Sequence, residues 1–160
     1  MKQSTSVLFV CLGNICRSPT AEAVFKHKAA EAGLDLFIDS AGTHGYHIGN
    51  PPDKRSQAAG VERGYSFKGL KCRRVHESDF EKFDYILAMD ESNLGNLHGM
   101  CPAQYHEKVS LFLDFCDEDE KEVPDPYYGG KRGFELVLDL IESASDGLIT
   151  HIKNASSSAV

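Results

Sequence analysis

The sequence contains no tryptophan, fewer positive than negative charges, and no long apolar run. Lysine and arginine number 17 against 24 aspartates and glutamates, which gives a formal net charge of −7 at pH 7. This balance excludes broad electrostatic attraction to nucleic acid or an anionic membrane, because both are negatively charged. A membrane-spanning helix would need about 20 consecutive apolar residues. We therefore expect no nucleic-acid partner and no membrane partner, although a local positive site is compatible with this composition.

Cysteine is sparse and irregularly spaced. The five cysteines are Cys11, Cys16, Cys72, Cys101 and Cys116. An odd number without the spacing of a disulfide framework is typical of a reducing, cytoplasmic setting. The apolar stretch near the N-terminus is too short for the core of a signal peptide. Because no Cys or His cluster has zinc-site spacing, we expect neither a metal nor a cofactor.

The length and apolar content fit one domain. The chain has 160 residues, of which 41% are hydrophobic, and this is enough to bury a core without metals or disulfides. We expect a single domain over residues 1–153 and a flexible tail over residues 154–160.

Short apolar runs alternate with helical patterns along the chain. Runs rich in branched and aromatic residues predict strands covered on both faces, at residues 7–10, 36–38, 85–88 and 109–113. Helical patterns cover residues 18–32, 53–63, 77–83, 91–97 and 133–152. Ser18 is the expected N-cap of the first helix. The alternation predicts an α/β fold with an open parallel sheet, whose ligands bind beyond the carboxyl ends of the strands.

The segment that follows the first run has the composition of an anion-binding loop. Gly13 and Asn14 tolerate left-handed backbone conformations, which allows successive N–H groups to point inward. The next helix adds the positive end of its dipole, and Arg17 adds a guanidinium that can hold two phosphate oxygens. The expected phosphate-binding residues are Leu12, Gly13, Asn14, Ile15, Cys16, Arg17 and Ser18. Together they predict a site for a doubly charged tetrahedral oxyanion.

Cys11, at the end of the first run, is the candidate nucleophile. The groups that bind an oxyanion also favour a thiolate, and the Ser18 hydroxyl can hydrogen-bond the sulfur. A sulfur anion beneath a bound phosphate suggests covalent catalysis through a phosphocysteine. Asp125 lies between two prolines after the last predicted strand, so it can return to the ligand edge. It is the candidate general acid for the leaving group and base for the hydrolytic water.

Four segments, in this order, resemble the low-molecular-weight protein tyrosine phosphatase family over nearly the whole chain. They are VLFVCLGNICRSPTAEAVF, DSAGTHGYHIGNPPDKRS, FDYILAMDESN and PDPYYGG. The resemblance implies a flavodoxin-like three-layer sandwich with a four-stranded parallel sheet and a phosphate-binding loop after the first strand. It also implies a phosphatase of phosphotyrosine proteins and small aryl phosphates, with Cys11 as nucleophile, Arg17 as phosphate clamp and Asp125 as acid and base.

The resemblance assigns further roles around the loop. Asn14, Ser18 and Ser40 would support its conformation, and Cys16 would form a reversible disulfide with Cys11 under peroxide. The residues that would line a deep cleft for phosphotyrosine are Leu12, Ile15, Tyr46, Tyr127 and Tyr128. We also expect a monomer that phosphate and other oxyanions inhibit. One departure is Leu70, which stands near the place where many members have a histidine that supports the serines of the loop.

Two other functions remain open on the residues alone. A thiol-dependent arsenate reductase would use a similar loop, but it needs resolving cysteines that usually form a close downstream pair. Here Cys72, Cys101 and Cys116 are far apart in the sequence. A phosphotyrosine-binding module without catalysis would be expected to lack Cys11, Arg17 or Asp125, and all of these are present.

Overall fold

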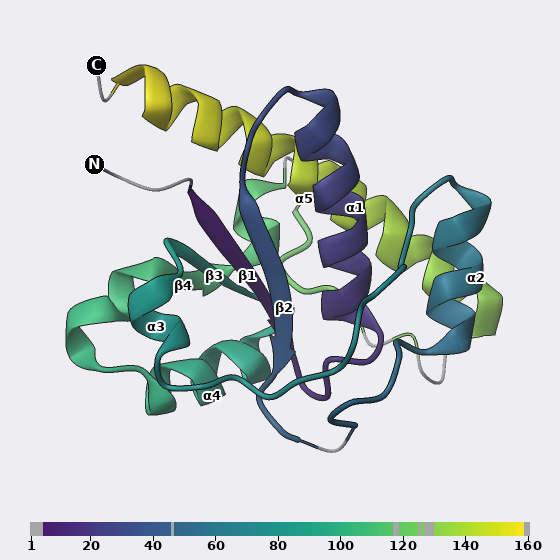
Figure 1. The fold of residues 1–160 in the computed structure, drawn as a ribbon, viewed down its shortest axis with the longest axis horizontal. Helices are drawn as coiled ribbons and strands as arrows, with labels where there is room; N and C mark the ends of the chain where they lie inside the picture. The colour runs from purple at the N-terminus through teal and green to yellow at the C-terminus, as the bar shows by residue number, and fades with distance from the viewer. Residues whose placement is uncertain (1–4, 46, 117–118, 125, 127–129, 159–160) are drawn as a thin grey trace.

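The computed structural model describes residues 5–45, 47–116, 119–124, 126 and 130–158. Its centre is a parallel sheet of four strands in the order β2-β1-β3-β4 (Figure 1). The strands are β1 (Ser6–Cys11), β2 (Phe37–Gly42), β3 (Tyr85–Ala88) and β4 (Val109–Leu111). Helices cover both faces of this sheet. The predicted α/β class and the flavodoxin-like three-layer arrangement are therefore confirmed.

The helices form two unequal layers. They are α1 (Arg17–Glu31), α2 (Lys54–Glu62), α3 (Asp79–Lys82), α4 (Glu91–Met100) and α5 (Gly130–Ser158), with the 3-10 helices η1 (Ala103–Lys108) and η2 (Phe112–Phe115). Figure 1 shows α1, α2 and α5 on one side of the sheet and α3 and α4 on the other. No helix in the described part of the chain has both the length and the apolar character needed to span a membrane.

The central strand β1 is the most deeply buried element. Its residues 7–10 have no solvent exposure, and β1 pairs with β2 on one side and β3 on the other. Because both faces are covered, its apolar run shows no alternation. On one face the ring of Phe9 packs edge-on against Phe25 of α1 and Phe112 of η2. This packing fixes the end of β1, where Cys11 lies.

Several element boundaries differ from the prediction. β2 continues to Gly42, because Ser40 is buried with its hydroxyl satisfied inside the protein, so its polarity did not mark the end of the strand. α1 begins at Arg17, and its N-cap Cys16 makes no side-chain capping bond. The prediction that Ser18 caps this helix is wrong, because the Ser18 hydroxyl turns toward Cys11.

The C-terminal helix α5 is longer than predicted. It ends at Ser158, so residues 154–158, which we expected in a flexible tail, are helical. No glycine or proline follows Gly147 to stop the helix. At Gly147, α5 comes so close to η2 that a Cβ atom would lie 1.8 Å from the Phe115 carbonyl oxygen. Glycine is therefore the only residue type that fits this contact without a backbone shift.

Candidate active site

Residues 12–16 form a short loop between β1 and α1, and neighbouring segments hold its carbonyls. The His44 N–H donates to the Leu12 carbonyl over 2.9 Å, and the Asp53 N–H donates to the Ile15 carbonyl over 2.8 Å. A planar trans peptide points its N–H away from its C=O. The N–H groups of the same two peptides, those of Gly13 and Cys16, therefore point away from His44 and Asp53, which is compatible with an anion-binding nest.

The turn of this loop depends on Asn14 and on its neighbour Gly42. Asn14 has φ of 57°, and no other non-glycine residue among those described has a positive φ. The sequence predicted that Gly13 and Asn14 could both adopt a left-handed backbone conformation, and only Asn14 does so. Gly42, at the end of β2, lies against the loop: a Cβ atom there would be 2.9 Å from Leu12 O, Gly13 C and Asn14 N. The loop can pack on β2 only because position 42 is glycine.

Cys11 and Ser18 meet inside the loop. The Cys11 sulfur lies 3.0 Å from the Ser18 hydroxyl oxygen, and both residues are buried. The Ser18 oxygen accepts a hydrogen bond from Asn14 Nδ2 over 2.9 Å. Its own proton can then go to the sulfur or to the Ala41 carbonyl, which is farther away at 3.4 Å. A hydroxyl proton directed at sulfur stabilises a thiolate.

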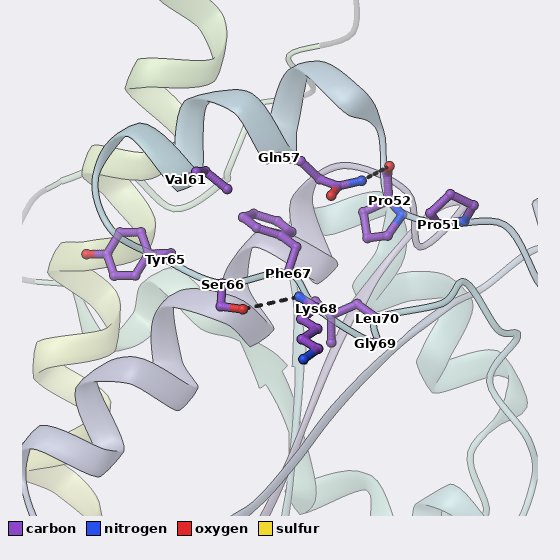
Figure 2. Close-up of a pocket in the computed structure, with 10 residues that line it drawn as sticks. All are labelled: Pro51, Pro52, Gln57, Val61, Tyr65, Ser66, Phe67, Lys68, Gly69 and Leu70. Atoms are coloured by element: carbon purple, nitrogen blue, oxygen red, sulfur yellow. Dashed lines mark hydrogen bonds between the residues drawn. The ribbon is translucent and has the colours of Figure 1, made fainter.

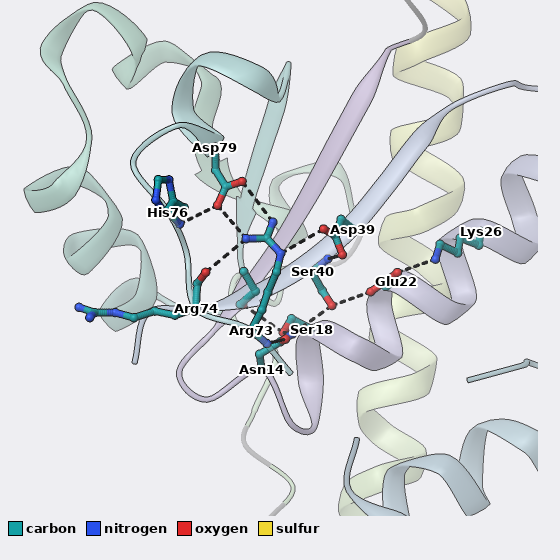
Figure 3. A network of polar contacts seen from close by, with 11 residues as sticks. Asn14, Ser18, Glu22, Lys26, Asp39, Ser40, Arg73, Arg74, His76 and Asp79 are labelled. Carbon is teal, nitrogen blue, oxygen red and sulfur yellow. Dashed lines mark hydrogen bonds and ion pairs between the residues drawn. The ribbon is translucent and has the colours of Figure 1, made fainter. Parts of the chain in front are cut away.

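A chain of buried polar groups continues from Asn14 away from the sulfur. Asn14 Nδ2 also donates to the Ser40 hydroxyl over 3.0 Å, and Ser40 donates to Glu22 Oε1 over 2.6 Å (Figure 3). Glu22 is only 4% exposed. Burial raises the pKa of Glu22, and hydrogen bonds from Lys26 and Ser40 oppose this shift only in part. The structure thus brings together Cys11, Asn14, Ser18 and Ser40, as expected, and adds Glu22.

Arg17 lies at the start of α1, where it joins three segments of the site. It is 4% exposed, and its Nη1 donates to Asp90 Oδ2 over 2.6 Å and to the Val123 carbonyl over 3.0 Å. Asp90 follows β3 and caps α4 by accepting from the Asn93 N–H. A buried guanidinium and a helix N-terminus thus lie at the end of the loop that follows Cys11. Together they can bind a tetrahedral oxyanion directly above the Cys11 sulfur.

Comparison with known proteins identifies the family. The family model "Low molecular weight phosphotyrosine protein phosphatase" matches residues 6–158. The chain belongs to this family. A low molecular weight protein-tyrosine-phosphatase of Bacillus subtilis is 47% identical over 151 residues, which cover 92% of this chain and 96% of that protein. The human low molecular weight phosphotyrosine protein phosphatase is 44% identical over 140 residues, with 82% and 85% covered.

A solved structure gives the same result. The crystal structure of a protein tyrosine phosphatase from Entamoeba histolytica, with Hepes in the active site, matches with a TM-score of 0.92 and 46% sequence identity. The match covers 96% of this chain and 99% of the Entamoeba chain. The family resemblance predicted from the four sequence segments is therefore confirmed.

The segment before Asp125 reaches this phosphatase loop. The Val123 N–H donates to the Met89 carbonyl over 2.7 Å, and Glu122 Oε2 accepts from the Glu91 N–H over 2.8 Å. These contacts hold the chain beside the carboxyl end of β3 and next to Arg17. The predicted acid Asp125 and the predicted cleft residues Tyr46, Tyr127 and Tyr128 lie outside the described residues.

Leu12 and Ile15, two of the residues predicted to line the cleft, lie within the described part of the chain. Leu12 is 40% exposed, and Ile15 is partly buried, so both reach the outer side of the loop. Cys16 and Cys11 are both buried, and no disulfide joins them. Within the described ranges, no group of three or more His, Cys, Asp or Glu side chains is arranged to hold a metal ion.

Leu70, the departure from the family pattern, has an apolar side chain that cannot hydrogen-bond the serines of the loop. It packs against the core and lines an open groove of about 540 Å³ between α2 and residues 65–70 (Figure 2). The Ser40 hydroxyl donates to Glu22. The side chain of position 70 takes no part in the hydrogen bonds described around the loop.

Three residues of the site were not predicted from the sequence: Glu22, Gly42 and Asp90. Asp90 carried a usable signal, because it is the second residue after a predicted strand, at the edge where ligands bind. Gly42 and Glu22 carried none, because their role depends on which segments fold against the loop.

Proposed function

We propose that this protein hydrolyses phosphotyrosine in proteins, and small aryl phosphates, through a phosphocysteine on Cys11. The observation that carries the proposal is the buried 3.0 Å contact between the Cys11 sulfur and the Ser18 hydroxyl, at the loop between β1 and α1. The named activity of the family supports the substrate class. The Entamoeba relative holds Hepes, a sulfonate buffer, in its active site. A sulfonate has the shape of a phosphate ester, which is consistent with this use of the loop.

The reaction has two displacements at phosphorus. In the first, the Cys11 thiolate attacks phosphorus, the bond from phosphorus to the tyrosine oxygen breaks, and Asp125 gives its proton to that oxygen. In the second, Asp125 takes a proton from water, the water oxygen attacks phosphorus, and the P–S bond breaks. Phosphate leaves and the thiolate returns. Arg17 and the loop amides stabilise the charge on the equatorial oxygens in both steps.

The depth of the nucleophile supports an aryl ester as substrate. Cys11 is only 3% exposed, so the phosphate must be carried to it on a long and narrow group. Leu12 and Ile15 offer apolar contact beside the loop. We propose that Tyr46, Tyr127 and Tyr128 complete the wall of the cleft. A phosphoserine is too short to place its phosphorus at the sulfur.

The proposal is tested with Cys11→Ser. This variant should lose hydrolysis of p-nitrophenyl phosphate, measured with EDTA present, but it should still bind inorganic phosphate because the loop amides and Arg17 remain. Cys116→Ser, at a buried cysteine that contacts Ser143, is the matched control and should keep full activity. Turnover by Cys11→Ser near the wild-type rate would overturn the assignment of the nucleophile.

The positions of the other cysteines favour a phosphatase over an arsenate reductase. Cys101 and Cys116 are buried in different core clusters. Cys72 is buried too, and burial raises its pKa, with a smaller contribution from Cys11. None of the three forms a disulfide. Thiol-coupled reduction of arsenate by the purified protein would favour the reductase, and tight phosphopeptide binding without phosphate release would favour a binding module.

We further propose redox control of Cys11 by Cys16. Peroxide would oxidise the Cys11 thiolate to a sulfenic acid, and the Cys16 sulfur would attack it, release water and form a disulfide that dithiothreitol reduces. None of the five cysteines forms a disulfide, which fits a reducing, cytoplasmic setting.

We also propose that the protein is a monomer. Among the described residues, the exposed large apolar side chains belong to different segments of the chain, which fits this state. The molar mass of the purified protein, measured by light scattering, tests whether it is a monomer.

A further inference from the structure

The guanidinium of Arg73 bridges two carboxylates behind the active-site loop. Its Nε donates to Asp39 Oδ2 over 3.1 Å, while Nη1 and Nη2 donate to the two oxygens of Asp79 over 2.9 and 3.2 Å (Figure 3). The Asp79 side chain is 6% exposed and also accepts from the His76 N–H. A planar guanidinium held at three donor atoms has little freedom to move. These contacts help to hold the backbone that carries it.

The backbone of Arg73 is hydrogen-bonded to the active-site loop. The Arg73 N–H donates to Asn14 Oδ1 over 2.8 Å. The segment around Arg73 belongs to no named strand and meets the sheet at an isolated bridge between Gly42 and Arg74, where the Gly42 N–H donates to the Arg73 carbonyl over 2.8 Å. The Gly49 N–H also donates to the Cys72 carbonyl, and the two ion pairs of Arg73 add to these backbone hydrogen bonds.

The Arg73 N–H decides which way the Asn14 amide faces. An asparagine side chain has an acceptor oxygen on one side and a donor NH₂ on the other. With Oδ1 on the Arg73 N–H, the NH₂ group faces the Ser18 and Ser40 oxygens. Both hydroxyls then accept from Asn14, and each has its own proton left to donate elsewhere. Ser40 donates to Glu22, and Ser18 is left to donate toward the Cys11 sulfur.

We propose that Arg73 is a positioning residue for the reaction of Cys11. Its ion pairs with Asp39 and Asp79 hold the N–H that orients Asn14, and Asn14 in turn directs the Ser18 proton to the sulfur. This inference rests on the proposed function, in which Cys11 is the nucleophile. Arg73 acts at a distance, through Asn14 and Ser18, and so it should govern the reactivity of the thiol and not the affinity for substrate.

The test compares Arg73→Met with Arg63→Met. Arg63 also pairs with several carboxylates, those of Glu135, Asp139 and Glu142, but on α5 and away from the loop. The readouts are the rate at which iodoacetamide alkylates Cys11 at pH 6, followed by peptide mass spectrometry, and kcat for p-nitrophenyl phosphate. Arg73→Met should slow both by about tenfold, the order of magnitude expected for one lost hydrogen bond to a charged group. Arg63→Met should change neither rate more than twofold. Equal rates for the two variants would overturn the proposal.

Epistasis separates positioning from general destabilisation. In a Ser18→Ala background the proton that Arg73 directs is absent, so Arg73→Met should slow alkylation no further. Independent, multiplying effects of the two substitutions would overturn the proposal.

Asp79→Asn is the second variant. It keeps the volume and the Asp39 contact, and it should give an intermediate rate. If wild type hydrolysed no phosphotyrosine while these alkylation effects held, the proposed function would fail and the positioning role of Arg73 would stand.

Discussion

The guanidinium of Arg17 donates to Asp90 Oδ2 over 2.6 Å, and the other Asp90 oxygen accepts from the Asn93 N–H at the start of α4. One carboxylate therefore ties the proposed phosphate clamp to the N-terminus of a helix on the opposite face of the sheet. The fold itself therefore helps to orient Arg17.

Asp90→Asn tests this relationship. An amide has only one acceptor oxygen, so if that oxygen still caps α4, its NH₂ group faces Arg17 and the guanidinium loses its carboxylate acceptor. We expect kcat/KM for p-nitrophenyl phosphate to fall about 10- to 100-fold, which corresponds to roughly 1.5–3 kcal/mol for a hydrogen bond to a charged group. Asp53→Asn is the control, because Asp53 caps α2 in the same way without touching Arg17. Equal activity of both variants would show that Asp90 does not orient the clamp.

Gly42→Ala tests the contact between β2 and the loop. The new methyl group would lie 2.9 Å from three backbone atoms of residues 12–14, so the loop must move. A displacement near 1 Å can cost about 10²-fold in rate, and we expect a loss of kcat of that order. Gly95→Ala is the control, in an exposed part of α4 with nothing within 4 Å of the added methyl group. It should keep full activity and raise the free energy of unfolding by roughly 0.5–1 kcal/mol.

Glu22 should make stability depend on pH. Burial raises the pKa of Glu22, so the folded state holds this proton at pH values where the unfolded chain has lost it. The free energy of unfolding should therefore fall as the pH rises through that range, by at most about 1.4 kcal/mol per pH unit for one proton. Glu22→Gln removes this dependence. Urea unfolding of both proteins between pH 4.5 and 7.5 measures it.

The decisive result is the sign of the change with pH in the difference between the unfolding free energies of wild type and Glu22→Gln. Wild type should lose stability relative to Glu22→Gln as the pH rises, and a gain would contradict the burial argument. Glu31→Gln, at a carboxylate that is 68% exposed on the same helix, is the matched control for the substitution itself.

Asp125→Asn tests the proposed general acid. An ester with a poor leaving group, such as phenyl phosphate, needs the proton, and we expect its turnover to fall about 10²- to 10⁴-fold. The nitrophenyl ester has a leaving group that barely needs protonation, so its rate should fall much less. Equal losses on the two esters would exclude the acid role of Asp125.

Much of this fold could be predicted, because its signals are local. The apolar residues of β1 and β3 mark buried strands, and Asp53 and Gly64 bound α2 as a cap and a left-handed terminus. The end of α5 could not be predicted, because its polar last turns have neither an apolar pattern nor a breaker. The role expected of Ser18 as a helix cap was wrong because tertiary contacts with Asn14 and Cys11 use the same hydroxyl.

The residues of the site also divide into those that a local sequence pattern marks and those that distant segments bring to the loop. Cys11, Arg17 and Ser18 lie within one short segment, so their spacing alone pointed to an oxyanion site. Glu22, Arg73 and Asp90 join it through partners 18 to 73 residues away in the sequence. Such pairings depend on which segments become neighbours, and a single sequence does not give that information.

Trapping the phosphorylated enzyme examines the chemistry of Cys11 directly. Wild type mixed with p-nitrophenyl phosphate, quenched in acid within milliseconds and digested, should yield a phosphoryl group on the peptide that contains Cys11. A burst of nitrophenolate that matches the enzyme concentration should accompany it. A phosphoryl group on another residue, or hydrolysis that continues in Cys11→Ser, would contradict the phosphocysteine mechanism.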